Sequence, residues 1–246
     1  MISRLDKHIA AAGLLLFVWI LLLPLLTNGI GPQFSLVQKA TNVCAAASQT
    51  SCSVTVSALG SGQIAVMTFF YASSTPRVVT VTGWGSNYAA CAGSAITSGS
   101  ASNAQLYNLS TTGGGTTITG SIPVATAFIS LEVRVFALTS GQAVLDTCNS
   151  VTFGGTSVSN PPGVALPGIT GVNDVIVQGA DPIGTVTGIS APYTDFEADS
   201  DGDGFASLLN SVSTTAPTWT MATTGKILGS AIAIKAVGGG QPIGPN

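Results

Sequence analysis

Alternating carboxylates dominate one short stretch of the chain, DFEADSDGDG at residues 195–204. Its acidic residues are Asp195, Glu197, Asp199, Asp201 and Asp203. The part from Asp199 to Gly204 matches the first half of a calcium loop, D-x-D-x-D-G. In such a loop, oxygens from alternate positions converge on one hard cation, while the glycine allows a sharp turn. The pattern makes this stretch the first candidate for metal binding.

The match to a calcium loop is incomplete. An EF-hand needs a bidentate glutamate at its last position, where this chain has Asn210. A looser calcium turn would need Asp195, Glu197 or backbone carbonyls to supply the missing oxygens. A plain acidic turn, solvated and without a cation, is the alternative, and both interpretations stay open.

Histidine-dependent catalysis is excluded by composition. The only histidine, His8, precedes an uncharged apolar run at residues 9–26, so the body of the chain has no imidazole base for a Ser-His-Asp or Cys-His mechanism. Carboxylate chemistry of the glycosidase type is the enzymatic alternative, and it needs two facing carboxylates. Outside the acidic stretch its candidates are Glu132, Asp146, Asp174 and Asp181. Because the sequence pairs none of them, we predict a non-enzymatic protein without catalytic residues.

The cysteines indicate a disulfide framework. They are Cys44, Cys52, Cys91 and Cys148, an even number without a C-x-x-C pair. Four cysteines allow three pairings. We expect Cys44–Cys52, which closes the short segment CAAASQTSC, and Cys91–Cys148, which joins two distant strands.

The N-terminus has the pattern of an export segment. Arg4 and Lys7 precede the apolar run, and the next cation is Lys39. The run is longer than the usual core of a signal peptide and close to the shortest membrane span. By the positive-inside rule, the part that follows is exported. We therefore predict a signal peptide or an uncleaved N-terminal transmembrane helix at residues 1–29, with the body secreted or at the cell surface.

The body has the pattern of an all-β domain. From residue 42 onward, short apolar or alternating runs are separated by Gly, Ser, Asn and Pro, a spacing typical of antiparallel sandwiches. We predict one N-terminal hydrophobic helix, a spacer at residues 30–41, an antiparallel jelly-roll-like β-sandwich at 42–237 and a flexible tail at 238–246. Within the sandwich, GFASLLNSV at 204–212 is the only stretch that could be a short helix.

One predicted strand, AFISLEVRVFAL, carries both signs of charge on its polar face. Alternation puts Leu131, Val133 and Val135 on one face, and Glu132 and Arg134 on the other. We expect a surface ion pair there, or cross-strand partners for the two residues, and a catalytic glutamate is the alternative. Cations are otherwise sparse in the body, so a phosphate-binding surface and a nucleic-acid partner are not expected.

Two aromatic residues in the loop-like segment GWGSNYAA are the best candidates for a sugar-binding platform. Trp84 and Tyr88 lie close together in sequence, and their rings could stack against a sugar. Packing in the core is the alternative, because Trp and Tyr are usually largely buried. The sugar interpretation makes an extracellular polysaccharide the partner, with calcium in the acidic stretch as its helper.

Several motifs occur in a recognisable order: VVTVTGWGSNY, AQLYNLSTTGGGTTITGSI, ISLEVRVFALTSGQAVLD, NDVIVQGA and GSAIAIKA. This order resembles that of secreted jelly-roll or concanavalin-like sandwich modules in bacterial and archaeal surface proteins. The matching positions are Tyr88, Tyr107, Gly113–Gly115, Leu145–Asp146 and Ile232–Ile234. The glutamate of that group falls near Ala137, so no role tied to it is expected here. The resemblance covers residues 42–236 and implies a sandwich fold and a surface location, without an activity.

These features predict a non-enzymatic extracellular or cell-surface β-sandwich module with an adhesive or envelope-structural role. A calcium-assisted carbohydrate-binding module and a subunit of a surface filament or other polymer are the alternatives. The expected partners are an extracellular polysaccharide, another surface protein or further copies of the chain. Contact with a membrane is expected only through the N-terminal helix.

Overall fold

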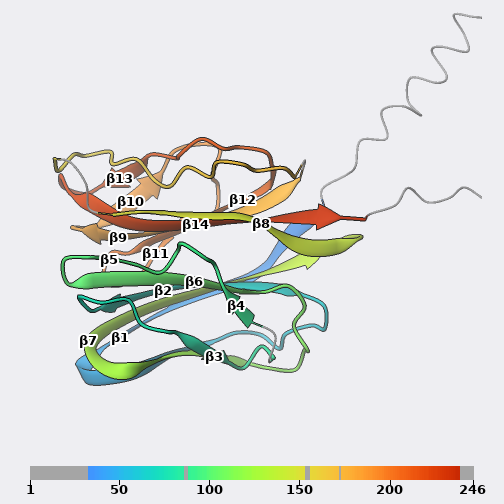
Figure 1. Ribbon diagram of the computed structural model, residues 1–246, viewed down its shortest axis with the longest axis horizontal. Coiled ribbons are helices and arrows are strands. Elements are labelled where there is room, and N and C mark those ends of the chain that lie inside the picture. Colours follow the sequence, from blue (N-terminus) through green and yellow to red (C-terminus); the bar gives the residue numbers. More distant parts are fainter. Residues whose placement is uncertain (1–32, 86–87, 153–155, 172, 239–246) are drawn as a thin grey trace, which may run out of the picture. The chain divides into compact units, whose positions relative to one another are not determined.

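The computed structural model describes residues 33–85, 88–152, 156–171 and 173–238 (Figure 1). Those residues form strands, turns and loops, and they contain no helix that could cross a bilayer. The predicted N-terminal helix at residues 1–29 and the tail from residue 239 lie outside the described residues. The predicted spacer is wrong from Phe34 onward, because the first strand begins there.

Most strands belong to two antiparallel sheets. In sheet A the order is β1 (Phe34–Thr55), β7 (Thr117–Leu138), β2 (Ile64–Ala72), β6 (Ala101–Asn108) and β4 (Tyr88–Ala90), with β3 (Thr80–Thr82) paired to β7 and β5 (Ile96–Ser98) paired to β6. In sheet B the order is β11 (Glu197–Ala198), β12 (Gly204–Ser211), β9 (Asp174–Ile183), β14 (Lys226–Val237) and β8 (Gln142–Val151). A separate pair consists of β10 (Val186–Ile189) and β13 (Trp219–Met221).

Sheet A folds back over itself. β1 and β7 stay paired along most of their length, but their register shifts between Ala45 and Ser51, and the two strands curl together at the lower left of Figure 1. On the returning part, Gly120 lies directly against Phe69 and Met67 of β2, so close that a Cβ atom would meet the Phe69 ring at 2.5 Å. The first hydrophobic core fills the space inside this fold, and its members include Val54, Val81, Ile118, Leu131 and Val133.

Two further cores lie on the two faces of sheet B. Between sheets A and B, Gly179 of β9 approaches Thr68 and Phe70 of β2 without room for a side chain. The core of this space includes Ile64, Val66, Phe136, Val175 and Ile234. The other face of sheet B packs under β10, β13 and the segment before β9, with Val164, Leu166, Ile176, Ala231 and Trp219 in the core. Figure 1 shows the resulting stack, with β10 and β13 above, the two sheets in the middle and β3 below.

The structure confirms the all-β, antiparallel fold and adds layers that were not predicted. Two facing sheets agree with a sandwich, but the folded part of sheet A and the β10–β13 pair bring further layers. The suggested short helix at 204–212 is wrong, because Gly204–Ser211 is the strand β12. β12 pairs with β9 along its length, and this pairing overrides the weak local preference of its residues.

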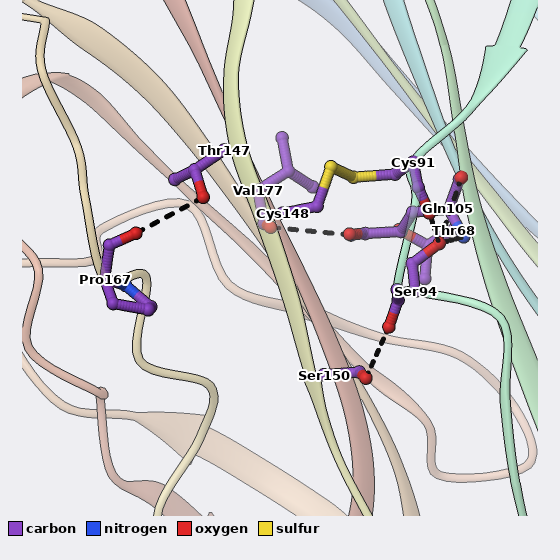
Figure 2. The surroundings of a disulfide bond; sticks show 10 residues. Thr68, Cys91, Ser94, Gln105, Thr147, Cys148, Ser150, Pro167 and Val177 are labelled. Carbon is purple, nitrogen blue, oxygen red and sulfur yellow. Dashed lines mark hydrogen bonds between the residues drawn. A yellow bond between two sulfur atoms is a disulfide. The ribbon is translucent and has the colours of Figure 1, made fainter.

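Both predicted disulfides form. Cys44–Cys52 spans the irregular part of β1, with 5.6 Å between the Cα atoms. Cys91–Cys148 joins the segment after β4 in sheet A to β8 in sheet B, with 6.0 Å between the Cα atoms. Figure 2 shows this bond beside two hydrogen bonds between the same layers, from Ser150 Oγ to the carbonyl of Gly93 (2.6 Å) and from Gln105 Nε2 to the carbonyl of Val177 (3.4 Å). The two disulfides indicate an oxidising, extracellular-type environment.

Candidate functional site

The space between sheets A and B is apolar at one end and polar along the rest. In the register of β2 with β7, Ile64 pairs with Phe136 at the apolar end, and Phe70 pairs with Ser130 at the other. Glu132 and Arg134 lie between these two pairs and face sheet B. Polar groups from both sheets therefore meet in the interior of the protein.

The predicted ion pair between Glu132 and Arg134 forms, but its expected place on the surface is wrong, because both residues are buried. Arg134 is 0% exposed and Glu132 is 1% exposed. One face of β7 is covered by the folded part of sheet A, and the other is covered by sheet B. The alternation of polar and apolar residues was predicted correctly, but its polar face points at a second sheet instead of water.

Arg134 is the centre of a buried network. Its Nη2 lies 2.8 Å from Glu132 Oε1, and its Nε donates a hydrogen bond of 2.9 Å to the same oxygen. Its Nη1 pairs with Asp195 Oδ2 and donates to Ser207 Oγ at 3.1 Å. The backbone N–H of Ser207 in turn donates to Asp195 Oδ1 at 2.6 Å. The network ties β7 to β12 and satisfies every nitrogen of the guanidinium group.

Burial and charge act in opposite directions on this network. Burial raises the pKa of Glu132 to about 7, and it would rise further without the neighbouring charge of Arg134. Burial opposes the charge of Arg134, but the carboxylates of Glu132 and Asp195 raise its pKa above the ordinary value. The charge of each group therefore favours the ionised form of the other, against the effect of burial.

Lys39 of β1 neutralises the next acid of the stretch. Its Nζ lies 3.1 Å from Glu197 Oε2 and donates to the carbonyl of Asp195, also at 3.1 Å. Thr41 Oγ1 donates to Glu197 Oε1 at 3.3 Å. We call Asp195 and Glu197 the paired acids, because each of them faces a cation of sheet A.

The rest of the acidic stretch closes around Asp199. Its Oδ1 accepts backbone hydrogen bonds from Asp201 (2.9 Å), Gly202 (2.9 Å) and Asp203 (3.0 Å). Its Oδ2 accepts a hydrogen bond from Ser130 of β7. The turn is therefore fixed on one side by its own backbone and on the other by sheet A.

Asp203, which is buried, and Asp181, which is partly buried, bring two more carboxylates to this turn. Asp203 is 2% exposed, and its Oδ2 has no hydrogen-bond partner among the described residues. Gly204 of β12 pairs with Ala180 of β9, so Asp203 and Asp181 lie one step further along the same two strands. We call Asp181, Asp199, Asp201 and Asp203 the unpaired acids.

The unpaired acids repel one another. Burial raises the pKa of Asp181 to about 7, and the charges of Asp201 and Asp199 raise it as well. Burial and the charges of Asp181, Asp199 and Asp201 raise the pKa of Asp203 well above its ordinary value. For neither Asp181 nor Asp203 does a described lysine or arginine lower the pKa. These carboxylates lack the counter-charge that the paired acids have.

The predicted five-residue metal site is divided by the structure. The carboxylates of Asp195 and Glu197 contact Arg134 and Lys39, so in this arrangement they are already paired with cations of sheet A. Asp199, Asp201 and Asp203 stay together, and Asp181 joins them from β9. Within the described ranges, no three Asp, Glu, His or Cys side chains converge closely enough to hold a metal ion as they stand.

The predicted sugar-stacking pair is also corrected by the structure. Trp84 is 1% exposed and belongs to the core inside sheet A. Asn108 Nδ2 donates to its carbonyl at 2.8 Å and holds the loop in place. Tyr88 is partly buried and packs against the same core. The face of the Trp84 ring is therefore not available to a sugar, and the ring anchors its loop instead.

A second group of carboxylates lies where β8, β9 and β14 meet. Asp146 accepts hydrogen bonds from Lys235 Nζ (2.9 Å), Thr170 Oγ1 (2.6 Å) and the backbone of Gly171 (3.0 Å). Burial alone would raise the pKa of Asp146, but these hydrogen bonds lower it. Asp174 is 0% exposed, and burial together with neighbouring Asp146 raises its pKa to about 7.

Comparison with known proteins does not assign the chain to a family. No family model matches it, and no curated protein or solved structure is similar enough to count as a match. The function is therefore argued from the contacts described above.

Proposed function

We propose that the chain is a non-enzymatic β-sandwich module of the cell surface or extracellular space, with an adhesive or envelope-structural role. The observation that carries this proposal is that the charged side chains form ion pairs that connect strands of the fold. Lys39 contacts Glu197, Arg134 contacts Glu132 and Asp195, and Lys235 contacts Asp146. These ion pairs link β1 to β11, β7 to the segment before β11, and β14 to β8.

The cross-links between layers support the same proposal. The Cys91–Cys148 bond connects sheets A and B, and Cys44–Cys52 holds the bend of β1. A disulfide that closes a long loop stabilises a fold mainly by restricting the unfolded chain. A module joined in this way suits a place outside the cytoplasm, where the environment is oxidising and disulfides persist. A jelly-roll type of sandwich, implied by the motif resemblance, is part of the proposal.

The proposed role can be tested on intact cells that produce the chain. Protease added outside should cleave it, and its cysteines should react with a maleimide only after reduction. Deletion of the gene should weaken adhesion or the integrity of the envelope, and the wild-type gene should restore it. A chain protected inside the cell with free thiols would contradict the proposal, as would hydrolysis of a polysaccharide by the purified chain.

A surface polymer is a second candidate, favoured by the edge of sheet B. β8 is the outermost strand on that side, and an unpaired strand edge is a template for pairing with another chain. Val144 on β8 is exposed. The polymer predicts concentration-dependent assembly in sedimentation velocity, abolished by Val144→Lys. The matched control is Val78→Lys, in an exposed segment outside the strands. A monomer at all concentrations would contradict this candidate.

A further inference from the structure

The unpaired acids come from two elements that the fold places side by side. Asp199, Asp201 and Asp203 belong to the turn between β11 and β12, and Asp181 belongs to β9. The pairing of Gly204 with Ala180 brings the turn and the strand together. The arrangement does not depend on the turn alone, because Ser130 of sheet A also holds Asp199.

Asp203 is the strongest sign that a ligand belongs here. Its side chain is almost completely buried, and its Oδ2 has no hydrogen-bond partner in the part of the chain that is described. A buried carboxylate oxygen without a partner is costly, because its hydration is lost and nothing replaces it. The charges that act on it are those of Asp181, Asp199 and Asp201, and a hydrogen bond from Ser130 is the one contact among the described residues that favours its ionised form, so the space around Asp203 is negative.

We propose that Asp181, Asp199, Asp201 and Asp203 bind one divalent cation of the calcium type. Calcium takes oxygen ligands in a flexible geometry, including carboxylates, backbone carbonyls and water. The four carboxylates supply oxygens of the right kind, and the cation supplies the missing positive charge. Because no three of the side chains converge at ligand distance in this structure, binding includes a rotation of carboxylates toward the cation.

Asp181 also explains how this loop differs from an EF-hand. The last loop position holds Asn210, and its side chain is occupied elsewhere: its Oδ1 accepts the backbone N–H groups of Gln33 (2.8 Å) and Phe34 (2.9 Å). It fastens the start of β1 instead of facing the cation. The acid that an EF-hand places at the end of its loop is replaced here by Asp181 from a neighbouring strand. The proposed site is therefore made by a turn and a sheet, without helices.

The proposal makes Glu197 a matched control. It belongs to the same acidic stretch, but it contacts Lys39 and Thr41 and lies outside the proposed ligand set. Full-length chain in a neutral detergent is titrated with calcium chloride by isothermal titration calorimetry, beside Asp203→Asn, Asp181→Asn and Glu197→Gln. Each variant is first melted in EDTA to confirm that it is folded.

The wild type should bind one calcium ion with a Kd of about 0.1–1 mM, the range of extracellular modules. Asp203→Asn and Asp181→Asn should each weaken binding at least tenfold, while Glu197→Gln stays within about twofold of the wild type. Magnesium should compete poorly, because it demands a stricter geometry. No binding by the wild type would overturn the proposal, as would several weak ions bound equally by all four proteins. This outcome is independent of the proposed surface role.

Discussion

The two halves of the acidic stretch are both rich in carboxylates but lie in opposite environments. Asp195 and Glu197 face Arg134 and Lys39, whereas Asp203 is buried without a cation near it. The difference arises from sheet A, which presents lysine and arginine to one half of the stretch and serine to the other. Within one run of like charges, the neighbouring residues therefore decide which acids form ion pairs inside the fold and which stay without a counter-charge.

The same contrast recurs at the meeting point of β8, β9 and β14. Asp146 is held as a carboxylate by Lys235 and Thr170, while Asp174 next to it is buried and has a raised pKa. Both places combine one satisfied acid with one that burial keeps from ionising. Neutralising an acid of the first kind should therefore lower the free energy of unfolding, and neutralising an acid of the second kind should raise it.

The largest effect is expected from the cation of the paired half. Arg134→Met leaves Glu132 and Asp195 in the interior without their partner, and removing one member of a buried ion pair costs about 3–5 kcal/mol. Urea unfolding measures this loss in the free energy of unfolding. Arg77→Met is the control, because Arg77 lies in the segment before β3, away from the network, and its loss should change little. Equal stabilities of the two variants would refute the role of Arg134.

Neutralising one acid in each half of the stretch should change the free energy of unfolding in opposite directions. Asp195→Asn removes the charge from the pair with Arg134 and should lower the free energy of unfolding by about 1.5–3 kcal/mol. Asp203→Asn relieves the repulsion from the neighbouring carboxylates in the absence of a cation and should raise the free energy of unfolding. Both are measured by urea unfolding in EDTA. Two changes of the same sign would remove the distinction.

Asp174 should make the stability of the fold depend on pH. Because its folded pKa is raised to about 7, the folded state holds a proton that the unfolded state releases from about pH 4 upward. Its contribution to stability is therefore complete below that pH and is lost as the pH rises to about 7. Asp174→Asn keeps the neutral form. Roughly three pKa units correspond to about 4 kcal/mol, so the Tm of the variant relative to wild type should be about 8–16 °C higher at pH 8 than at pH 4. A constant difference would show that Asp174 does not titrate in this range.

The smallest effect is expected at the solvent-facing pair. Lys39 and Glu197 are each partly exposed, and ion pairs of that kind contribute about 0.2–1 kcal/mol. Lys39→Met should therefore destabilise the chain much less than Arg134→Met, and high salt should remove most of the difference from wild type. A loss as large as that of Arg134→Met would mean that Lys39 belongs to the buried network.

The sequence predicts the fold further than it predicts the site. Alternating runs and the even number of cysteines are local signals, and both the strands and the two disulfides follow from them. The buried position of Glu132 and Arg134 does not follow from a local signal. Alternation assigns residues to the two faces of a strand, but it does not show whether water or another sheet covers each face. The burial of Trp84 depends in the same way on the fold of sheet A over itself.

The partners of the acidic stretch depend on contacts far apart in the sequence. Asp181 reaches the turn only because β9 and β12 pair in one particular register, and Lys39 comes from a segment that composition alone marks as a spacer. The motif D-x-D-x-D-G identifies the turn correctly, but it cannot name the strand that completes it. The pairing of strands that are distant in sequence therefore decides which acids belong to the paired set and which to the unpaired set.

Urea unfolding of wild type and Asp203→Asn, each in EDTA and in millimolar calcium, tests this distinction most directly. In EDTA the variant should be the more stable of the two, because it lacks the repulsion around Asp203. Calcium at ten times the wild-type Kd should stabilise the wild type by about 1.4 kcal/mol and the variant, which binds at least tenfold more weakly, by at most about 0.4 kcal/mol. The advantage of the variant should therefore shrink by about 1 kcal/mol or more when calcium is added. An advantage of the same size in both conditions would contradict the account.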